Sequence, residues 1–161
     1  MAAIRTAVIG VGYLGKFHAE KYVGMDGVDL IGVVDTNPDT ARKIAEKLST
    51  TPYTDHTELL DKVDAVSVVV PTQYHFPIAM DFLENRVDVL VEKPMTSTVE
   101  EADQLIAFAQ SQNCILQVGH LERFNPAVAP LKDIVNKPAF IESHRMSIYQ
   151  ARGTDVSVVM D

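Results

Sequence analysis

The chain of 161 residues is 47% hydrophobic and 22% charged, a balance typical of one soluble domain with a hydrophobic core. Its formal net charge of −8 argues against a nucleic-acid partner, because binding to phosphates needs concentrated positive charge. No apolar run approaches the roughly 20 residues needed to cross a bilayer, so no membrane partner is expected either.

Strand and helix patterns alternate along most of the chain. The expected strands are residues 4–9, 28–34, 52–54, 65–70, 87–91 and 115–118. The run AVSVVV at 65–70 is almost entirely β-branched, which is typical of a strand covered on both faces. The regular alternation predicts parallel pairing through right-handed crossovers. The fold class is therefore α/β, with a doubly wound Rossmann sheet over residues 1–120.

Helix starts are marked by local signals between these strands. Asn37 is an N-cap candidate with Pro38 at the first helical position, and Thr98 with Glu101 forms a capping box. Three more helices are expected: one after the first glycines, a short one at 57–61 and one that begins near Pro77.

The end of the chain departs from this alternation. A helix is expected from Asn125 to about Val135, followed by one long strand at 139–149 with polar residues interspersed. We interpret residues 121–161 as a connecting helix and the first strand of a truncated α+β C-terminal domain, from a protein about twice as long. The unpaired edges of that strand would be a template for another chain, so a homo-oligomer is expected.

A glycine-rich loop follows the first strand, in the sequence GVGYLG. Gly10 allows a tight turn, Gly12 lets the backbone approach a pyrophosphate, and Gly15 lets the next helix pack closely. Tyr13 and Leu14 complete this candidate cofactor loop. The alternative is that the glycines serve only tight packing.

Asp35 ends the second strand, 20 residues after Gly15, which is the acidic position of a dinucleotide site. Its carboxylate can accept hydrogen bonds from both ribose hydroxyls and would repel a 2′-phosphate. Thr36 follows, without an adjacent arginine. We therefore expect NAD as the cofactor in preference to NADP, while a solvated turn residue is the alternative role for Asp35.

The turn after the fourth strand reaches the same carboxyl edge of the sheet. Pro71, Thr72 and His75 should run beside the cofactor, through side chains or backbone. For His75, hydrogen bonding to local backbone is an equal alternative. His18, inside the first helix, is expected to be a packed structural residue.

The fifth strand ends in Glu92-Lys93-Pro94, which should emerge near the nicotinamide half of the cofactor. There, Lys93 could hydrogen-bond a substrate hydroxyl and help carry its proton as hydride leaves. Pro94 restrains the turn, through either a trans or a cis bond. The alternative is a solvated lysine at a strand end.

Together with the glycine loop, several stretches resemble the N-terminal half of the glucose–fructose oxidoreductase and inositol dehydrogenase family (Gfo/Idh/MocA). They are VIGVGYLGKFHAEKY, VVDTNP, VVVPTQYHFPIAMDFLENRVDVLVEKPMTSTVEEADQLIAFAQ and VGHLERFNPAV. The resemblance implies an NAD(P)-dependent dehydrogenase of sugars, cyclitols or nucleotide sugars, with Lys93 beside nicotinamide and substrate, and Glu92 at the cofactor.

The stretch GHLERFNPAV is similar to a branch of that family acting on nucleotide sugars of the UDP-N-acetylglucosamine type at the 3-hydroxyl. By that likeness His120, Arg123 and Asn125 would line the cofactor or substrate cleft. The family's aspartate and histidine motif would fall beyond residue 161, so Lys93 alone should support little turnover.

The single cysteine, Cys114, excludes an intrachain disulfide and a cysteine-rich metal site, and no metal is expected. With an N-terminus too short for a signal peptide, this indicates the reducing cytoplasm. Two other functions stay open: a non-catalytic module that senses NAD and docks a partner, and an S-adenosylmethionine methyltransferase. The methyltransferase gives no reason for Glu92-Lys93-Pro94.

Overall fold

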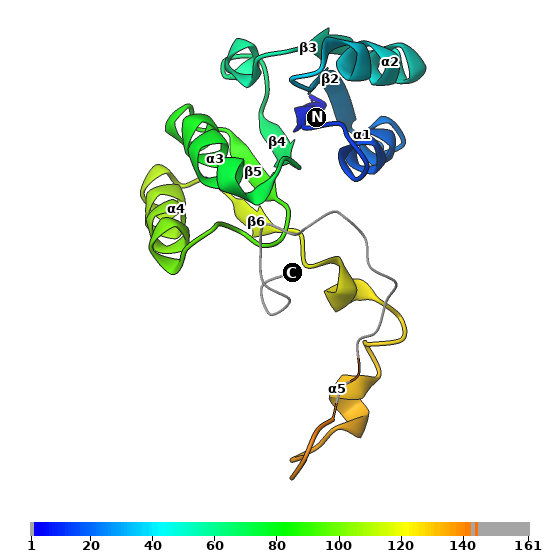
Figure 1. The fold of residues 1–161 in the computed structure, drawn as a ribbon, viewed down its shortest axis with the longest axis vertical. Coiled ribbons are helices and arrows are strands. Elements are labelled where there is room, and N and C mark those ends of the chain that lie inside the picture. The colour runs from blue at the N-terminus through cyan, green and yellow to red at the C-terminus, as the bar shows by residue number, and fades with distance from the viewer. Residues whose placement is uncertain (1, 143, 145–161) are drawn as a thin grey trace.

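The computed structural model describes residues 2–142 and 144. Its centre is one parallel sheet with helices on both faces (Figure 1). The strands are β1 (Ile4–Ile9), β2 (Val28–Val34), β3 (Thr51–Tyr53), β4 (Ala65–Val68), β5 (Asp88–Val91) and β6 (Leu116–Val118). They lie in the order β3-β2-β1-β4-β5-β6, which is that of a Rossmann fold and confirms the prediction.

Two pairs of helices cover the sheet. The helices are α1 (Gly15–Val23), α2 (Pro38–Leu48), α3 (His75–Glu84), α4 (Val99–Gln112) and the short α5 (Leu131–Ile134). Short 3₁₀ turns are η1 (His56–Leu59), η2 (Thr72–Tyr74) and η3 (Leu121–Phe124). The pair α1 and α2 packs on β1 to β3, whereas α3 and α4 pack on β4 to β6 (Figure 1).

Each pair of helices closes its own hydrophobic cluster. Val8 and Val33 face α1 and α2, where Ala19 and Ala45 pack against them. On the opposite face, the α3 and α4 side buries a larger cluster around Phe82. Alternate residues of the central strands point to opposite faces, so one sheet serves both clusters.

The two helix caps predicted from the sequence are present. The side chain of Asn37 accepts hydrogen bonds from Asp39 N and Thr40 N at 3.0 and 3.3 Å. Thr98 and Glu101 form the reciprocal capping box at the start of α4. These caps satisfy backbone N–H groups that a helix start would otherwise leave unpaired.

The helix predicted from Asn125 to Val135 is wrong in extent. Residues 126–130 form turns, in which Asn125 Oδ1 accepts from Ala127 N at 2.9 Å, and the helix α5 begins only at Leu131. The physical reason is Pro130, which has no N–H for the interior of a helix that starts at residue 125. The helix predicted to begin near Pro77 starts two residues earlier, at His75.

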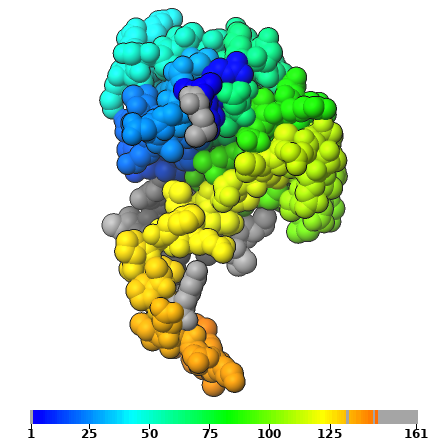
Figure 2. All heavy atoms as spheres, turned by 180° about the vertical axis from the view of Figure 1, so that it is seen from behind, coloured from blue at the N-terminus to red at the C-terminus, as the bar shows by residue number. Residues whose placement is uncertain are grey.

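The segment after β6 leaves the body of the molecule (Figures 1 and 2). It carries exposed apolar side chains, among them Phe124, Ile134 and Phe140, which are 76%, 73% and 81% exposed. Residues 139–142 carry no regular secondary structure. The rest of the strand predicted at 139–149 lies outside the described residues, apart from residue 144, and the domain boundary near residue 120 stays a prediction.

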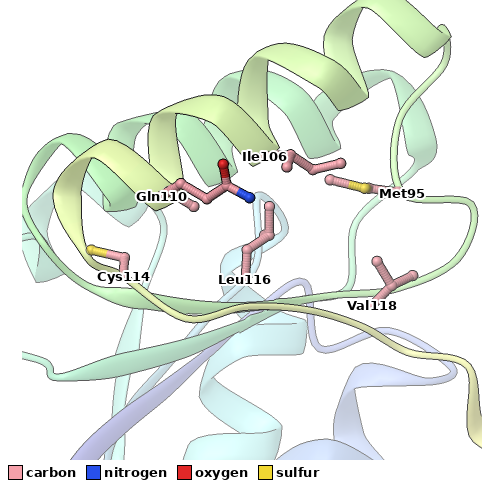
Figure 3. Close-up of a pocket in the computed structure, with 7 residues that line it drawn as sticks. Met95, Ile106, Gln110, Cys114, Leu116 and Val118 are labelled. Atoms are coloured by element: carbon pink, nitrogen blue, oxygen red, sulfur yellow. The ribbon is translucent and has the colours of Figure 1, made fainter.

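A hollow of about 320 Å³ lies between α4 and the edge strand β6 (Figure 3). Its lining is mostly apolar and consists of Met95, Ile106, Ala109, Gln110, Cys114, Leu116 and Val118. Partial burial there raises the pKa of the Cys114 thiol above its usual 9.0, so the sulfur stays protonated at neutral pH. Cys114 therefore acts as a small, largely apolar group in the wall of this hollow.

Candidate functional site

The loops with candidate residues leave the sheet at one edge. The first residue after each of four strands donates a backbone hydrogen bond to a neighbouring strand; these are Gly10, Val69, Glu92 and Gly119, with N···O distances of 2.8, 2.8, 3.0 and 2.8 Å. The loops after β2, β1, β4 and β5 carry most of the candidate residues, and these four strands are consecutive in the sheet. Neighbouring strands lie about 4.8 Å apart, so the four strand ends span about 14 Å. Ligands of open α/β sheets bind at this edge.

Within the glycine loop, two glycines are required by the protein's own packing. Gly10 has a φ of +86°, and a Cβ there would lie 2.5 Å from Val69 O. A Cβ on Gly15 would lie 1.8 Å from Gly10 O. Gly12 differs, because no atom of the described residues lies within 4 Å of a Cβ built on it. Internal packing does not demand a glycine there, whereas a ligand lying over the loop would.

The start of α1 offers backbone donors to such a ligand. Among the described residues no side chain caps this helix, in contrast to α2 and α4. Its first turn holds Lys16 and no acidic residue, so the positive end of the helix dipole is not neutralised locally. Tyr13 and Leu14 are exposed beside it, at 63% and 45%.

Asp35 is linked to the glycine loop. Its Oδ2 accepts a hydrogen bond from Val11 N at 3.2 Å, and its Oδ1 accepts one from Asn37 N at 3.0 Å. The carboxylate thus joins the loop after β1 to the loop after β2. Thr36, the next residue, is exposed. The sequence predicted both segments, but not this bond between them.

The turn after β4 presents Pro71 to solvent and buries Thr72 and His75. The His75 ring is 1% exposed, and its Nδ1 and Nε2 lie 2.8 Å from Pro94 O and Val70 O. Both ring nitrogens therefore contact backbone carbonyl oxygens, which is the alternative to a cofactor contact that the sequence left open. One partner is distant in sequence, so His75 ties the turn after β4 to the turn after β5.

Glu92 and Lys93 emerge at the end of β5, and the Lys93–Pro94 bond is cis. Lys93 is half-buried, whereas Glu92 is only 6% exposed. The Glu92 Oε2 accepts from Lys93 N at 3.1 Å, and its Oε1 lies 3.2 Å from His18 Nε2. Burial alone would raise the pKa of Glu92, but the hydrogen bonds from His18 and Lys93 N hold it below the usual 4.5.

His120 and Arg123 lie on the segment that follows β6, and both are exposed. Asn125 is half-buried beside them and bonds Glu122 and Ala127 within its own turn. This segment begins directly after the carboxyl end of β6.

Among the described residues, no helix is long and apolar enough to cross a membrane. Nor does that part of the chain bring three or more histidine, cysteine, aspartate or glutamate side chains into a group that could hold a metal ion.

Comparison with known proteins agrees with this geometry. Residues 4–120 match the family described as "Oxidoreductase family, NAD-binding Rossmann fold". The whole chain is 40% identical to UDP-N-acetylglucosamine 3-dehydrogenase of Acidithiobacillus ferrooxidans, and covers 51% of that protein. Over 80% of its length it is 36% identical to scyllo-inositol 2-dehydrogenase (NAD(+)) of Bacillus subtilis, of which it covers 39%.

Among solved structures, GenD2 from gentamicin A biosynthesis in complex with NAD superposes with a TM-score of 0.80. It is 30% identical, and the match covers 83% of this chain and 39% of that one. The chain thus spans about half, or less, of the length of the relatives it matches.

The Glu92 carboxylate should make the stability of the fold depend on acid. Its folded pKa lies below the unfolded value, so its contribution is full above about pH 4.5 and is lost as pH falls through the folded pKa. We expect Glu92→Gln to lower the free energy of unfolding at pH 7 by about 2 kcal/mol. Urea unfolding from pH 7 to 3 measures it, and the difference from wild type should shrink below pH 4.5.

Asp64→Asn is the matched control for this titration. Asp64 accepts from Arg5 N at 2.8 Å and pairs with the Arg5 side chain, but its side chain is 44% exposed. The loss at pH 7 should be smaller than for Glu92→Gln, because solvent screens exposed pairs. A Glu92→Gln difference that stays constant down to pH 3 would contradict an ionised, buried Glu92.

Proposed function

We propose a function from the premise that this chain belongs to the Gfo/Idh/MocA oxidoreductase family, whose NAD-binding Rossmann domain it matches over residues 4–120. It is the cofactor-binding half of an NAD-dependent dehydrogenase that oxidises a hydroxyl of a sugar or nucleotide sugar. The observation that carries this proposal is the space that the described residues leave open over Gly12, at the start of α1, where none of their side chains caps the helix, and at the same edge as Lys93.

The dinucleotide would lie along the carboxyl edge of the sheet. Asp35 would bond the adenosine ribose, and the backbone of residues 10–15 with the start of α1 would hold the pyrophosphate. Pro71 and Thr72 would flank the nicotinamide half, where β4 and β5 end. The NAD complex of a relative with the same fold supports this path.

A nicotinamide cofactor supplies hydride transfer, and this chain would supply a group for the accompanying proton. Lys93 would hydrogen-bond the substrate hydroxyl and help to carry its proton. The substrate class is supported by the relatives, which are named for UDP-N-acetylglucosamine and inositol oxidation. His120 and Arg123 would line the cleft towards the substrate. The matched region is about half or less of those relatives, so the remaining catalytic groups would lie outside residues 1–161.

The proposal includes a cellular setting and an assembly state. A reducing cytoplasm is supported by the single protonated thiol of Cys114. A homo-oligomer is supported by the apolar side chains that the projecting segment exposes after β6.

The glycine loop can be tested by Gly12→Ala, in a fluorescence titration with NADH. The variant should fold with an unfolding free energy within about 1 kcal/mol of wild type, because its Cβ meets open space. It should weaken NADH binding at least tenfold, or about 1.4 kcal/mol, because the methyl group occupies the pyrophosphate position.

Gly24→Ala is the control for that experiment. It adds the same methyl group at the end of α1, where the nearest atom is 3.6 Å away. NADH affinity should be unchanged. If Gly12→Ala binds NADH as well as wild type does, the pyrophosphate does not lie on this loop and the proposed site is wrong.

Preference for NAD over NADP can be tested through Asp35. Wild type should bind NADH at least about tenfold more tightly than NADPH, because a 2′-phosphate would meet the carboxylate. Asp35→Asn keeps an oxygen acceptor for the loop but removes the charge, so the ratio of the two dissociation constants should fall several-fold. An unchanged ratio would show that the Asp35 carboxylate does not face the 2′ position.

Assembly can be tested by light scattering over a hundredfold range of concentration. The mass should exceed 17.7 kDa at the upper end, because the exposed apolar segment favours association. Substituting Phe124 and Phe140 by serine should return the chain to a monomer. A wild-type mass that stays at the monomer value throughout would exclude the homo-oligomer.

A further inference from the structure

Behind the cofactor edge, four polar side chains form a continuous chain of contacts from α1 across β4 to β5. The Tyr22 hydroxyl lies 2.6 Å from Ser67 Oγ, and Ser67 Oγ lies 3.2 Å from His18 Nδ1. On its other side, His18 Nε2 lies 3.2 Å from Glu92 Oε1. The last link is the hydrogen bond from Lys93 N to Glu92 Oε2.

Glu92 determines how these hydrogen bonds run. Its lowered pKa makes it an ionised carboxylate at neutral pH, which can only accept. The N–H of His18 Nε2 must therefore donate a hydrogen bond to Oε1. This holds whichever of His18 Nδ1, Ser67 and Tyr22 donates in the other two contacts. One carboxylate oxygen is held by the histidine, and the other holds the backbone of Lys93.

Surrounding atoms leave the carboxylate little freedom. Ser67 is fully buried, and the side chains of His18 and Glu92 are 14% and 8% exposed. A Cβ on Gly119 would lie 2.8 Å from Glu92 Oε1 and 3.0 Å from its Cδ. The end of β6 thus closes one side of the carboxylate, while His18 holds another.

Such a pair is an unpromising way to gain stability alone. A buried carboxylate loses solvation that the hydrogen bonds of its partners barely offset, and apolar residues of similar size often do as well or better. The α3 side of the same strands is indeed packed with apolar residues. A role in placing the neighbouring residue accounts for a buried, ionised carboxylate at this position.

We propose that His18 and Glu92 are positioning residues for Lys93. Glu92, held by His18, fixes the backbone N–H of Lys93 and so sets the direction in which the lysine side chain leaves the sheet edge. This inference rests on the proposed function, which places Lys93 beside the nicotinamide.

The test compares binding of NADH and of ADP-ribose, which lacks the nicotinamide ring, by calorimetry. Lys93→Ala should weaken NADH binding about fivefold to tenfold and leave ADP-ribose within twofold. Glu92→Gln should give the same selective loss. In the double variant the loss should equal that of Lys93→Ala alone, because both changes act through one side chain.

Two further variants separate positioning from stability. His18→Leu with Glu92→Leu replaces the pair by apolar groups, which can keep the fold stable, yet the selective loss of NADH affinity should remain. Asp64→Asn removes a carboxylate that, like Glu92, accepts hydrogen bonds from a backbone N–H and from a side chain, but it precedes β4 rather than following β5. It should leave the ratio of the two dissociation constants unchanged.

Amide hydrogen exchange adds a direct readout on Lys93. Its N–H should exchange about tenfold faster in Glu92→Gln than in wild type, relative to Val91. Unchanged exchange, additive losses in the double variant, or equal losses for both ligands would overturn the positioning role. If wild type binds neither ligand, or Lys93→Ala leaves their ratio unchanged, the proposed function fails instead, and the exchange rate still decides whether Glu92 holds Lys93.

Discussion

The close approach of the glycine loop to itself constrains everything at the carboxyl edge. Gly15 lies so close to Gly10 O, and Gly10 to Val69 O, that no side chain fits at either position, and the start of α1 is held against the end of β1. His18 and Tyr22 follow at helical spacing, so they fall on one face of α1 and reach β4 and β5. The turn of the glycine loop therefore also places the residues behind Lys93.

Local features of the fold could be read from the sequence, because local interactions determine them. The caps at Asn37 and Thr98 bond residues within three positions, and β-branched runs form strands wherever a sheet covers them. The helix predicted at 125–135 is shorter in the structure, because Pro130 lacks the N–H that a helix interior needs.

Long-range bonds were not predictable in the same way. His18 and Glu92 are 74 residues apart, and His75 and Pro94 are 19 apart, so no spacing in the sequence signals either contact. That the loops after the strands meet at one edge of the sheet could be predicted from the strand order alone. Predicting which polar atoms meet there needs the tilt of α1 and the path of two turns, which depend on packing throughout the domain. The sequence motifs identify the residues proposed to bind or react. The contacts that support those residues appear only in the folded structure.

The hydrophobic core of the described chain lies within the region that matches the NAD-binding family. Both hydrophobic clusters consist of buried residues between Ala7 and Ala109, and the described residues after β6 add nothing to them. The region that matches the NAD-binding family therefore carries its own core. This explains how relatives named for nucleotide-sugar and inositol oxidation both match it. Such enzymes would all need a lysine whose side chain is held in one direction beside the reacting carbon. A buried carboxylate that accepts a hydrogen bond from the backbone N–H of that lysine would hold it so for any substrate.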